Sequence, residues 1–485
     1  MRPRFVSLVR LALILLPAAC GGGGANHATT SSSAFSASGS AGAGGSGSNG
    51  GAGSGGAGGA GGVPGLSSPC GWNLRITDLV AGIAVDAEHN LLLTGFQFAG
   101  VGDIGGHPLP GKGPGLLAKV GGDGIPTWTH AWTGSGLASA NLRSGPNDDI
   151  ILVGSVDGSV DFGGGPLTST YDDWDFFAAR YDRSGKHLWS KVFASPGSDG
   201  LLGMGVDAAG AVFMAGSFGS TIDLGGGPLA ADGNLFLGKL DSAGNHLWSK
   251  SFGAATLDHM VYGVAVDPGG GVILAGSYED TIDFGDGPLG GGAGVNGAFV
   301  VRFDSDGHLL WSKRLGQDAF TQAHNVALDA AGHIIVGGEY SASIDVGGGP
   351  VLGPGGFVVA LDPAGQPLWG HTLPGVWGVH GLAAVASGQV LASGSFTGTV
   401  DLGSGPVSAT HDASFIVALD ATGQTLWSRT YGDSVNQYGA RLLPNDAGSF
   451  FACGDCSAPI DLGSGVMPFS GSPLGFDLYL AKLSL

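Results

Sequence analysis

The chain has 485 residues, 97 of them glycine, and its 39 acidic and 19 basic side chains give a formal net charge of −20. The glycines lack the strict three-residue period of collagen. The small number of Lys and Arg argues against nucleic acid as a partner, because phosphate binding needs clustered cations. Four cysteines in so long a chain exclude a scaffold built from disulfides.

The N-terminus predicts a lipoprotein signal peptide over residues 1–19. Three arginines among the first ten residues precede the apolar run Leu11–Leu16, and Ala18-Ala19-Cys20 follows. A basic start, a short apolar stretch and small residues are typical of a secretory signal, and the stretch is too short to span a membrane. The ending resembles the bacterial lipobox, although Pro17 departs from it. We therefore expect lipidation of Cys20 and a membrane anchor on the outer membrane or cell surface. The alternative is an ordinary cleaved signal and a periplasmic or secreted protein.

Residues 20–67 are almost wholly Gly, Ala, Ser, Thr and Asn. Such a segment buries too little apolar surface to offset the entropy of ordering it, which predicts a flexible tether. The folded part is therefore expected over residues 68–485.

Two ladders of repeated residues run through this folded part. One is an aspartate between apolar residues, usually followed by Gly-x-Pro, and it recurs every 56 to 62 residues at Asp103, Asp161, Asp223, Asp283, Asp345, Asp401 and Asp461. The other is a tryptophan, generally in Leu-Trp-Ser-Lys, which recurs every 56 to 63 residues at Trp72, Trp128, Trp189, Trp248, Trp311, Trp369 and Trp427. A fixed period with seven members in each ladder indicates a repeat architecture.

Each unit contains four short runs of β-branched and aromatic residues bounded by Gly, Pro and Asp, which are strand signals. Four antiparallel strands repeated seven times predict an all-β, seven-bladed β-propeller. The last unit lacks a tryptophan strand, whereas the segment around Trp72 precedes the first unit. The N-terminal strand is therefore expected to complete the last blade beside Tyr479 and close the ring. The alternative, an open solenoid, would leave both terminal edges uncapped.

The elements Val-x-Val-Asp-x-x-Gly, Ala-Gly-Ser-Phe, Ile-Asp-Phe-Gly and Asp-x-x-Gly-x-x-Leu-Trp-Ser-Lys resemble the SBBP-type β-propeller repeats of bacterial surface and secreted proteins. The resemblance covers about residues 70 to 485, and the first two units depart from it most. It implies a propeller and an extracytoplasmic address. It implies no reaction, since a fold does not determine function.

The connections that lead from each tryptophan strand to the next blade are candidates for a ligand surface. In propellers such loops gather around the channel mouth, where ligands usually bind. Several of them carry aspartate, so this face is expected to be acidic with a polar-aromatic rim. A loop of the second blade adds two aromatics, although packing of Trp174 over its own blade is the alternative there. The candidate ligand-binding residues are Asp258, Tyr262, Trp377, Tyr438, Arg441, Tyr171 and Trp174.

Three histidines in these connections, His259, His324 and His380, come from successive blades. Converging imidazoles would bind a divalent transition metal, whereas the alternative is three unrelated surface histidines. The recurring aspartates are interpreted as turn residues rather than calcium ligands, because each loop offers one carboxylate among glycines. The ladder tryptophans are interpreted as blade-packing residues.

Export to an oxidising compartment would permit a disulfide. We expect one from Cys70 to Cys453 or Cys456, which would fasten the closing strand; the alternative is a local Cys453–Cys456 bond. The folded part contains no Gly-x-Ser-x-Gly, His-Glu-x-x-His or Walker sequence. The sequence thus predicts a monomeric, surface-anchored binding, adhesion or scaffold module for protein or polysaccharide, with no cofactor. The alternative is an extracytoplasmic metal-assisted hydrolase or lyase that uses the three histidines.

Overall fold

The structure is a computed structural model, and the residues that it describes lie within residues 68–485. The described residues are 70–76, 79–96, 103–104, 106–108, 113, 115–135, 137–170, 174–193, 200–229, 234–253, 259–290, 296–316, 320–346, 349–432, 441–446, 448–456, 459–462, 466–467 and 477–485. The predicted signal peptide, Cys20 and the tether lie outside them. In the described ranges, no helix is long and apolar enough to cross a membrane.

The described strands form seven main antiparallel sheets, which confirms the all-β expectation. The first contains β2 (Leu79–Val85), β3 (Leu91–Phe96), β6 (Leu116–Val120) and β7 (Pro126–Ala131); the second β9 (Leu137–Ser144), β10 (Ile150–Asp157), β13 (Asp175–Tyr181) and β14 (His187–Phe193); the third β15 (Gly200–Val206), β16 (Val212–Ser217), β17 (Leu235–Leu240) and β18 (His246–Phe252). The fourth contains β19 (Met260–Val266), β20 (Val272–Glu279), β23 (Asn296–Phe303) and β24 (Leu309–Leu315); the fifth β25 (Thr321–Leu328), β26 (Ile334–Tyr340), β29 (Gly355–Leu361) and β30 (Pro367–Pro374).

The sixth sheet contains β31 (Val376–Ala384), β32 (Val390–Asp401), β33 (Pro406–Leu419) and β34 (Thr425–Tyr431); the seventh β35 (Arg441–Asp446), β36 (Ser449–Cys456), β39 (Asp477–Ser484) and β1 (Cys70–Ile76), extended by β4 (Asp103–Ile104) and β5 (His107–Pro108). Short strands outside the main sheets are β8 (Thr133–Gly134), β11 (Ser159–Asp161), β12 (Pro166–Thr168), β21 (Thr281–Asp283), β22 (Pro288–Gly290), β27 (Ser343–Asp345), β28 (Pro350–Leu352), β37 (Ile460–Asp461) and β38 (Val466–Met467). A 3-10 turn, η1, spans Pro146–Asp148.

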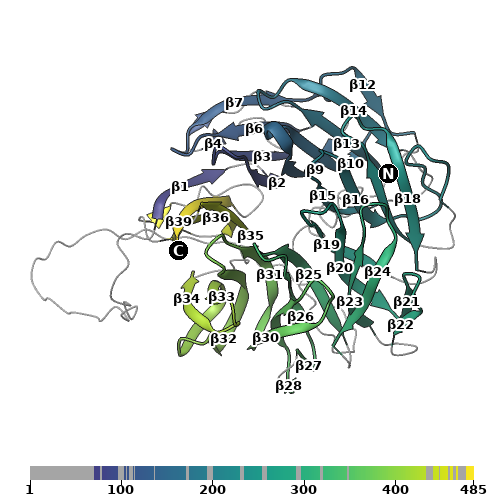
Figure 1. The fold of residues 1–485 in the computed structure, drawn as a ribbon. Coiled ribbons are helices and arrows are strands. Elements are labelled where there is room, and N and C mark those ends of the chain that lie inside the picture. The colour runs from purple at the N-terminus through teal and green to yellow at the C-terminus, as the bar shows by residue number, and fades with distance from the viewer. Residues whose placement is uncertain are drawn as a thin grey trace, which may run out of the picture. The chain divides into compact units, whose positions relative to one another are not determined.

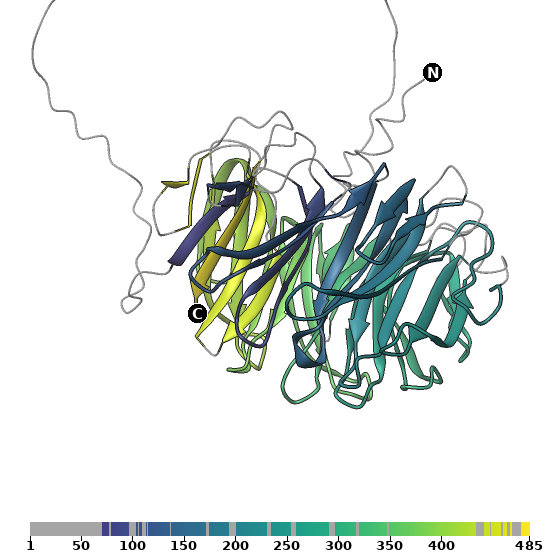
Figure 2. The ribbon, with the colours of Figure 1, turned by 90° about the horizontal axis from the view of Figure 1, so that it is seen from above.

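The main sheets are arranged like the blades of a β-propeller (Figure 1). The first strand of each sheet contacts the first strand of the next, in the order β2, β9, β15, β19, β25, β31, β35 and back to β2. Hydrophobic cores lie between neighbouring sheets; one contains Phe213 and Leu237 of the third sheet together with Phe299 and Val301 of the fourth. Figure 2 shows the same sheets from above. The middle strands of each sheet are continuous apolar runs in the sequence because the two neighbouring sheets bury both of their faces.

The chain ends meet in the seventh sheet, as the sequence predicts. β1 pairs antiparallel with β39, with Trp72 opposite Lys482 and Arg75 opposite Tyr479. The two strands lie side by side at the purple and yellow ends of the colour scale (Figure 1). The seam with the first sheet is apolar, since Ile83 and Leu91 share a core with Phe451 and Leu480. The N-terminal strand therefore supplies the outer strand of a sheet whose other main strands come from the C-terminal end.

The ladder tryptophans pack between sheets, which confirms their structural interpretation. Trp189 Nε1 donates to the carbonyl oxygen of Ser242 at 3.0 Å, in the β17–β18 turn of the next sheet. Trp248 and Trp311 make the same bond to Ser305 and Pro363. The turn carries Gly244 at a φ of +80°, and a Cβ there would lie 3.0 Å from the Trp189 ring. Glycine is thus required both by the backbone conformation and by the contact with the indole.

Basic side chains join the same turns. Lys119, Arg180, Lys239 and Arg302, each on the third strand of its sheet, form ion pairs with Asp86, Asp149, Asp207 and Asp267 at 2.7, 2.8, 3.2 and 2.7 Å. Arg180 also donates to the carbonyl oxygens of Gly210 and Ser242 in the third sheet. Three of these cations also donate to a turn of the next sheet, at Ser242 for Arg180, Ser305 for Lys239 and Pro363 for Arg302, and so link neighbouring sheets.

The aspartates of the first ladder act as turn residues. Oδ1 of Asp161 accepts the backbone N–H groups of Gly163 and Gly165 at 2.7 and 3.0 Å. Asp223, Asp283 and Asp401 accept the corresponding pairs of N–H groups. The carboxylate therefore stabilises a glycine turn, in agreement with the turn interpretation.

The expected disulfide is wrong. Cys453 and Cys456 are buried, and neither is part of a disulfide. They stand three residues apart on β36 and so face opposite sides of the sheet, which excludes the local bond as well; Cys453 packs toward the first sheet and Cys456 toward the sixth. Cys70 lies opposite Leu483, which in turn lies opposite Phe450. Two strand spacings, roughly 10 Å, therefore separate Cys70 from β36, beyond the reach of a disulfide.

Both β36 thiols are expected to resist a thiol reagent in the native protein and to react once the chain is unfolded in urea without reductant. Burial raises the pKa of the Cys453 thiol to about 12, so almost no thiolate is present at neutral pH. Mass spectrometry of the labelled peptide containing both cysteines checks this. A peptide cross-linked to Cys70 would contradict the strand register.

Candidate functional site

The first strands of five sheets carry the same β-bulge. In β2, β15, β19, β25 and β31 a residue in the first half of the strand has no partner on the second strand. These residues are Ala81, Leu202, Tyr262, His324 and His380; β31 has a second irregularity between Val376 and Val379. A bulge re-aims the side chain of its extra residue, so Tyr262, His324 and His380 depart from the alternation of their strands.

In three successive sheets the bulge residue carries a polar ring. The ring centres of Tyr262 and His324 are 5.2 Å apart, and those of His324 and His380 are 5.1 Å apart. The rings form a continuous row across the fourth, fifth and sixth sheets because each occupies the equivalent position of its strand. The structure therefore brings together two of the three predicted metal ligands and one predicted ligand-binding residue.

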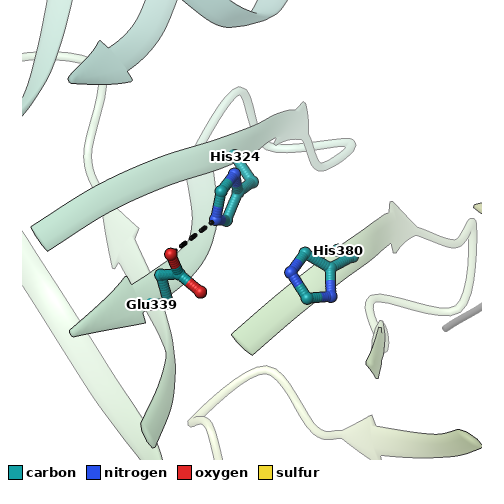
Figure 3. Close-up of side chains that lie close together, drawn as sticks. All are labelled: His324, Glu339 and His380. Carbon is teal, nitrogen blue, oxygen red and sulfur yellow. Dashed lines mark ion pairs between the residues drawn. The ribbon is translucent and has the colours of Figure 1, made fainter. Parts of the chain in front are cut away.

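An acidic residue that sequence reasoning missed joins this row. Glu339 on β26 lies 3.7 Å from His324, measured from Oε1 to Nε2 (Figure 3). His324, Glu339 and His380 each place one ligand atom within 4.8 Å of the others'. The sequence did carry a signal: the sixth residue of the second strand is serine in four sheets, at Ser155, Ser217, Ser277 and Ser395. Glu339 replaces that serine beside the imidazoles.

The backbone around these side chains leaves room for them. Gly378 has a φ of +147°, and a Cβ there would lie 3.1 Å from Glu339 Oε2 and 3.2 Å from His380 Nε2. A larger residue would fill the space between the carboxylate and the imidazole. Asn325 Nδ2 donates to the backbone oxygen of His380 at 2.8 Å, which ties β31 to β25 next to the site.

The environment keeps His380 neutral. Burial lowers its pKa to about 3, and the nearby His324 ring adds to the effect. In the described part of the chain, neither His380 Nδ1 nor His324 Nε2 has a hydrogen-bond partner, although both atoms are buried. Buried polar atoms normally have partners. His324 therefore retains a nitrogen beside Glu339 that is available to a ligand.

His259 does not belong to this group, which corrects the predicted metal ligand set. It lies just before β19, is fully buried, and its Nδ1 accepts the backbone N–H of Glu279 at 3.3 Å. The equivalent of His324 and His380 in the fourth sheet is Tyr262, three residues later. The spacing from the inner turn shows this, because Tyr262 and His324 each precede the turn aspartate, Asp267 or Asp329, by five residues.

The remaining predicted ligand residues are dispersed. Trp377 lies on β31, directly before Gly378, and is 40% exposed. Arg441 begins β35 in the seventh sheet and Trp174 precedes β13 in the second, both partly buried. Asp258, Tyr438 and Tyr171, and the aspartates expected to make the mouth acidic, lie outside the described residues.

We call Tyr262, His324, Glu339, Trp377 and His380 the polar-aromatic patch. It combines two aromatic rings, two imidazoles and a carboxylate, which suits it to hold a ligand through ring contacts and hydrogen bonds. Its His-Glu-His part offers two nitrogens and one carboxylate, a donor set that suits a transition metal. The patch contains no Ser, Thr or Cys to act as a nucleophile.

Neither family models nor curated proteins match the chain, so membership of the SBBP-type repeats stays a prediction. Solved structures with a similar course include a protein of unknown function from Bacteroides caccae (TM-score 0.35, 11% identity, covering 75% of this chain and 94% of that one). Two other solved structures match to a similar degree. Sqt1 from Chaetomium thermophilum has a TM-score of 0.38 and 11% identity over 84% of this chain and 97% of that one. YCF48 bound to D1 peptide has a TM-score of 0.41 and 13% identity over 86% of this chain and 97% of that one.

Proposed function

We propose that this chain is a seven-bladed β-propeller, anchored outside the cytoplasm through Cys20, that acts as a binding module for another protein. The anchor and the address rest on the sequence of residues 1–20. The blade number is supported by the seven main sheets of the described residues and by the circle of contacts between their first strands. The ligand is proposed to bind at the polar-aromatic patch.

The observation that carries the binding role is the exposure of Trp377, which stands three residues before His380 on β31. The other exposed large apolar side chains of the described residues are leucines and one isoleucine. Tryptophan and tyrosine dominate the binding energy of protein interfaces, particularly where polar groups surround them. The repeat's aspartates and basic residues serve turns and contacts between sheets, whereas the patch departs from the repeat.

Substitution of Trp377 by alanine tests the proposal. We expect residues 68–485 to capture a specific protein from an envelope extract of the producing organism, and Trp377→Ala to bind that purified protein roughly 30-fold more weakly, the loss of about 2 kcal/mol typical of a central aromatic. Leu310→Ala is the matched control, because Leu310 is 51% exposed on β24, an outer strand.

The binding role at this patch fails if Trp377→Ala and Leu310→Ala bind the captured protein as tightly as the wild type. If residues 68–485 bind a glycan array but capture no protein, the ligand is a polysaccharide and not a protein. Equal loss in both variants would place the contact elsewhere on the propeller.

A further inference from the structure

The His-Glu-His part of the patch has the geometry of an incomplete metal coordination sphere. His324 comes from β25, Glu339 from β26 and His380 from β31, and their side chains point toward one another (Figure 3). Ligand atoms bound to zinc lie about 2.0–2.2 Å from the ion, which places them roughly 3–4 Å from each other. The 3.7 Å between His324 and Glu339 already falls in this range, and the whole group lies within 4.8 Å.

One potential donor atom is not used for a hydrogen bond within the protein. In the described residues, His324 Nε2 is buried without a hydrogen-bond partner, and it lies beside the Glu339 carboxylate. His380 directs Nε2 toward the same carboxylate (Figure 3). A bound cation would engage a nitrogen of each imidazole and the carboxylate at once. By contrast, His333 forms a complete pair with Asp329, with 2.8 Å between Nδ1 and Oδ2.

We propose that His324, Glu339 and His380 bind one divalent first-row transition metal, with zinc as the reference ion. Two imidazoles and one carboxylate suit such an ion, whereas calcium and magnesium prefer shells of oxygen. Three protein ligands leave a coordination position open. Asn325 supports the site from outside, because its bond to the His380 backbone holds the two ligand-bearing inner strands together.

This inference does not depend on which macromolecule the domain binds. It differs from the sequence-based set in using Glu339 in place of His259. The negative net charge of the chain favours cations in general, so the experiment must separate this site from adventitious binding at other carboxylates and histidines.

The test is titration of the full chain, stripped with EDTA and dialysed, with zinc alone in a calorimeter. We expect one equivalent to bind, and Glu339→Gln and His380→Gln each to bind about 100-fold more weakly, since each removes a ligand while keeping a similar shape. His333→Gln is the matched control, because it removes an imidazole that pairs with a carboxylate elsewhere, and it should bind zinc like the wild type. Circular dichroism establishes whether each variant is folded. If either Glu339→Gln or His380→Gln fails to fold, the zinc affinity of the other variant decides the test.

The proposal is overturned if the wild type takes up no stoichiometric zinc, or if Glu339→Gln and His380→Gln retain wild-type affinity. A rise in melting temperature on adding zinc should accompany binding in the wild type and His333→Gln but not in the two ligand variants. The titration contains no macromolecular ligand, so its outcome is separate from that of the Trp377 experiment.

Discussion

A chain that begins at residue 79 is expected to lose cooperative folding, whereas a chain that begins at residue 68 should unfold like the whole protein. The shorter chain lacks β1, whose pairing with β39 runs from Cys70 to Ile76. Net contributions of about 1 kcal/mol for each backbone hydrogen bond amount to several kcal/mol. That loss is comparable with the whole stability of a typical domain. Thermal unfolding followed by circular dichroism measures the difference.

Loss of β1 also leaves β39 as an open edge, which favours association with other chains. Size-exclusion chromatography should therefore show larger species for the chain that begins at residue 79. A synthetic peptide of residues 68–78 should restore part of the transition when added in excess. Identical melting curves for the two chains would show that the β1–β39 pairing does not hold the structure together.

Arg180→Ala should destabilise the protein by about 3–5 kcal/mol, the cost of breaking a buried ion pair by removing one partner. The Arg180 side chain is 6% exposed, and its Nε and Nη2 donate to Asp149 Oδ2 at 3.0 and 2.8 Å. Its Nη1 bonds the carbonyl oxygens of Gly210 and Ser242 at 2.8 and 3.1 Å. Alanine would leave a carboxylate and two carbonyls without this donor. Urea unfolding monitored by fluorescence gives the change.

Arg183 provides the matched control, because it lies exposed in the adjacent turn. Arg183→Ala should change stability by less than about 0.5 kcal/mol. Arg180→Lys should fall between the two, since one ammonium cannot reproduce the guanidinium's planar set of bonds. Equal stability of Arg180→Ala and Arg183→Ala would show that the link between the second and third sheets carries little energy.

Much of the fold could be predicted from the sequence because the residues that form each turn and each strand lie close together in the chain and recur in every repeat. Strands are bounded by turns that need aspartate and glycine, and the tryptophan spacing reflects a contact made once in each sheet. The pairing of β1 with β39 followed from counting strands at the two ends of the chain. These features depend on neighbours in the sequence or on the period, and both can be read without coordinates.

The site was less predictable because it depends on pairing register. A bulge is a property of two strands, so the sequence did not show that Tyr262 and His324 leave the ladder, although both stand five residues before a turn aspartate. Glu339 comes from β26, a strand in the interior of its sheet, whereas the sequence analysis looked for ligand residues in the connections between sheets. The cysteines show the same limit, since proximity in the sheet depends on which residues face each other across three strands.

The bulge recurs in five inner strands but holds four residue types, at Ala81, Leu202, Tyr262 and the two histidines His324 and His380. Tyr262, His324 and His380 take no part in the cross-strand ladder. A substitution at one of these three positions changes the chemistry of the polar-aromatic patch, while the hydrogen bonds between the strands persist. Such a scaffold can acquire a new binding specificity one repeat at a time, because the bulge residues that contact a ligand are not the residues whose backbone pairing holds the sheets together.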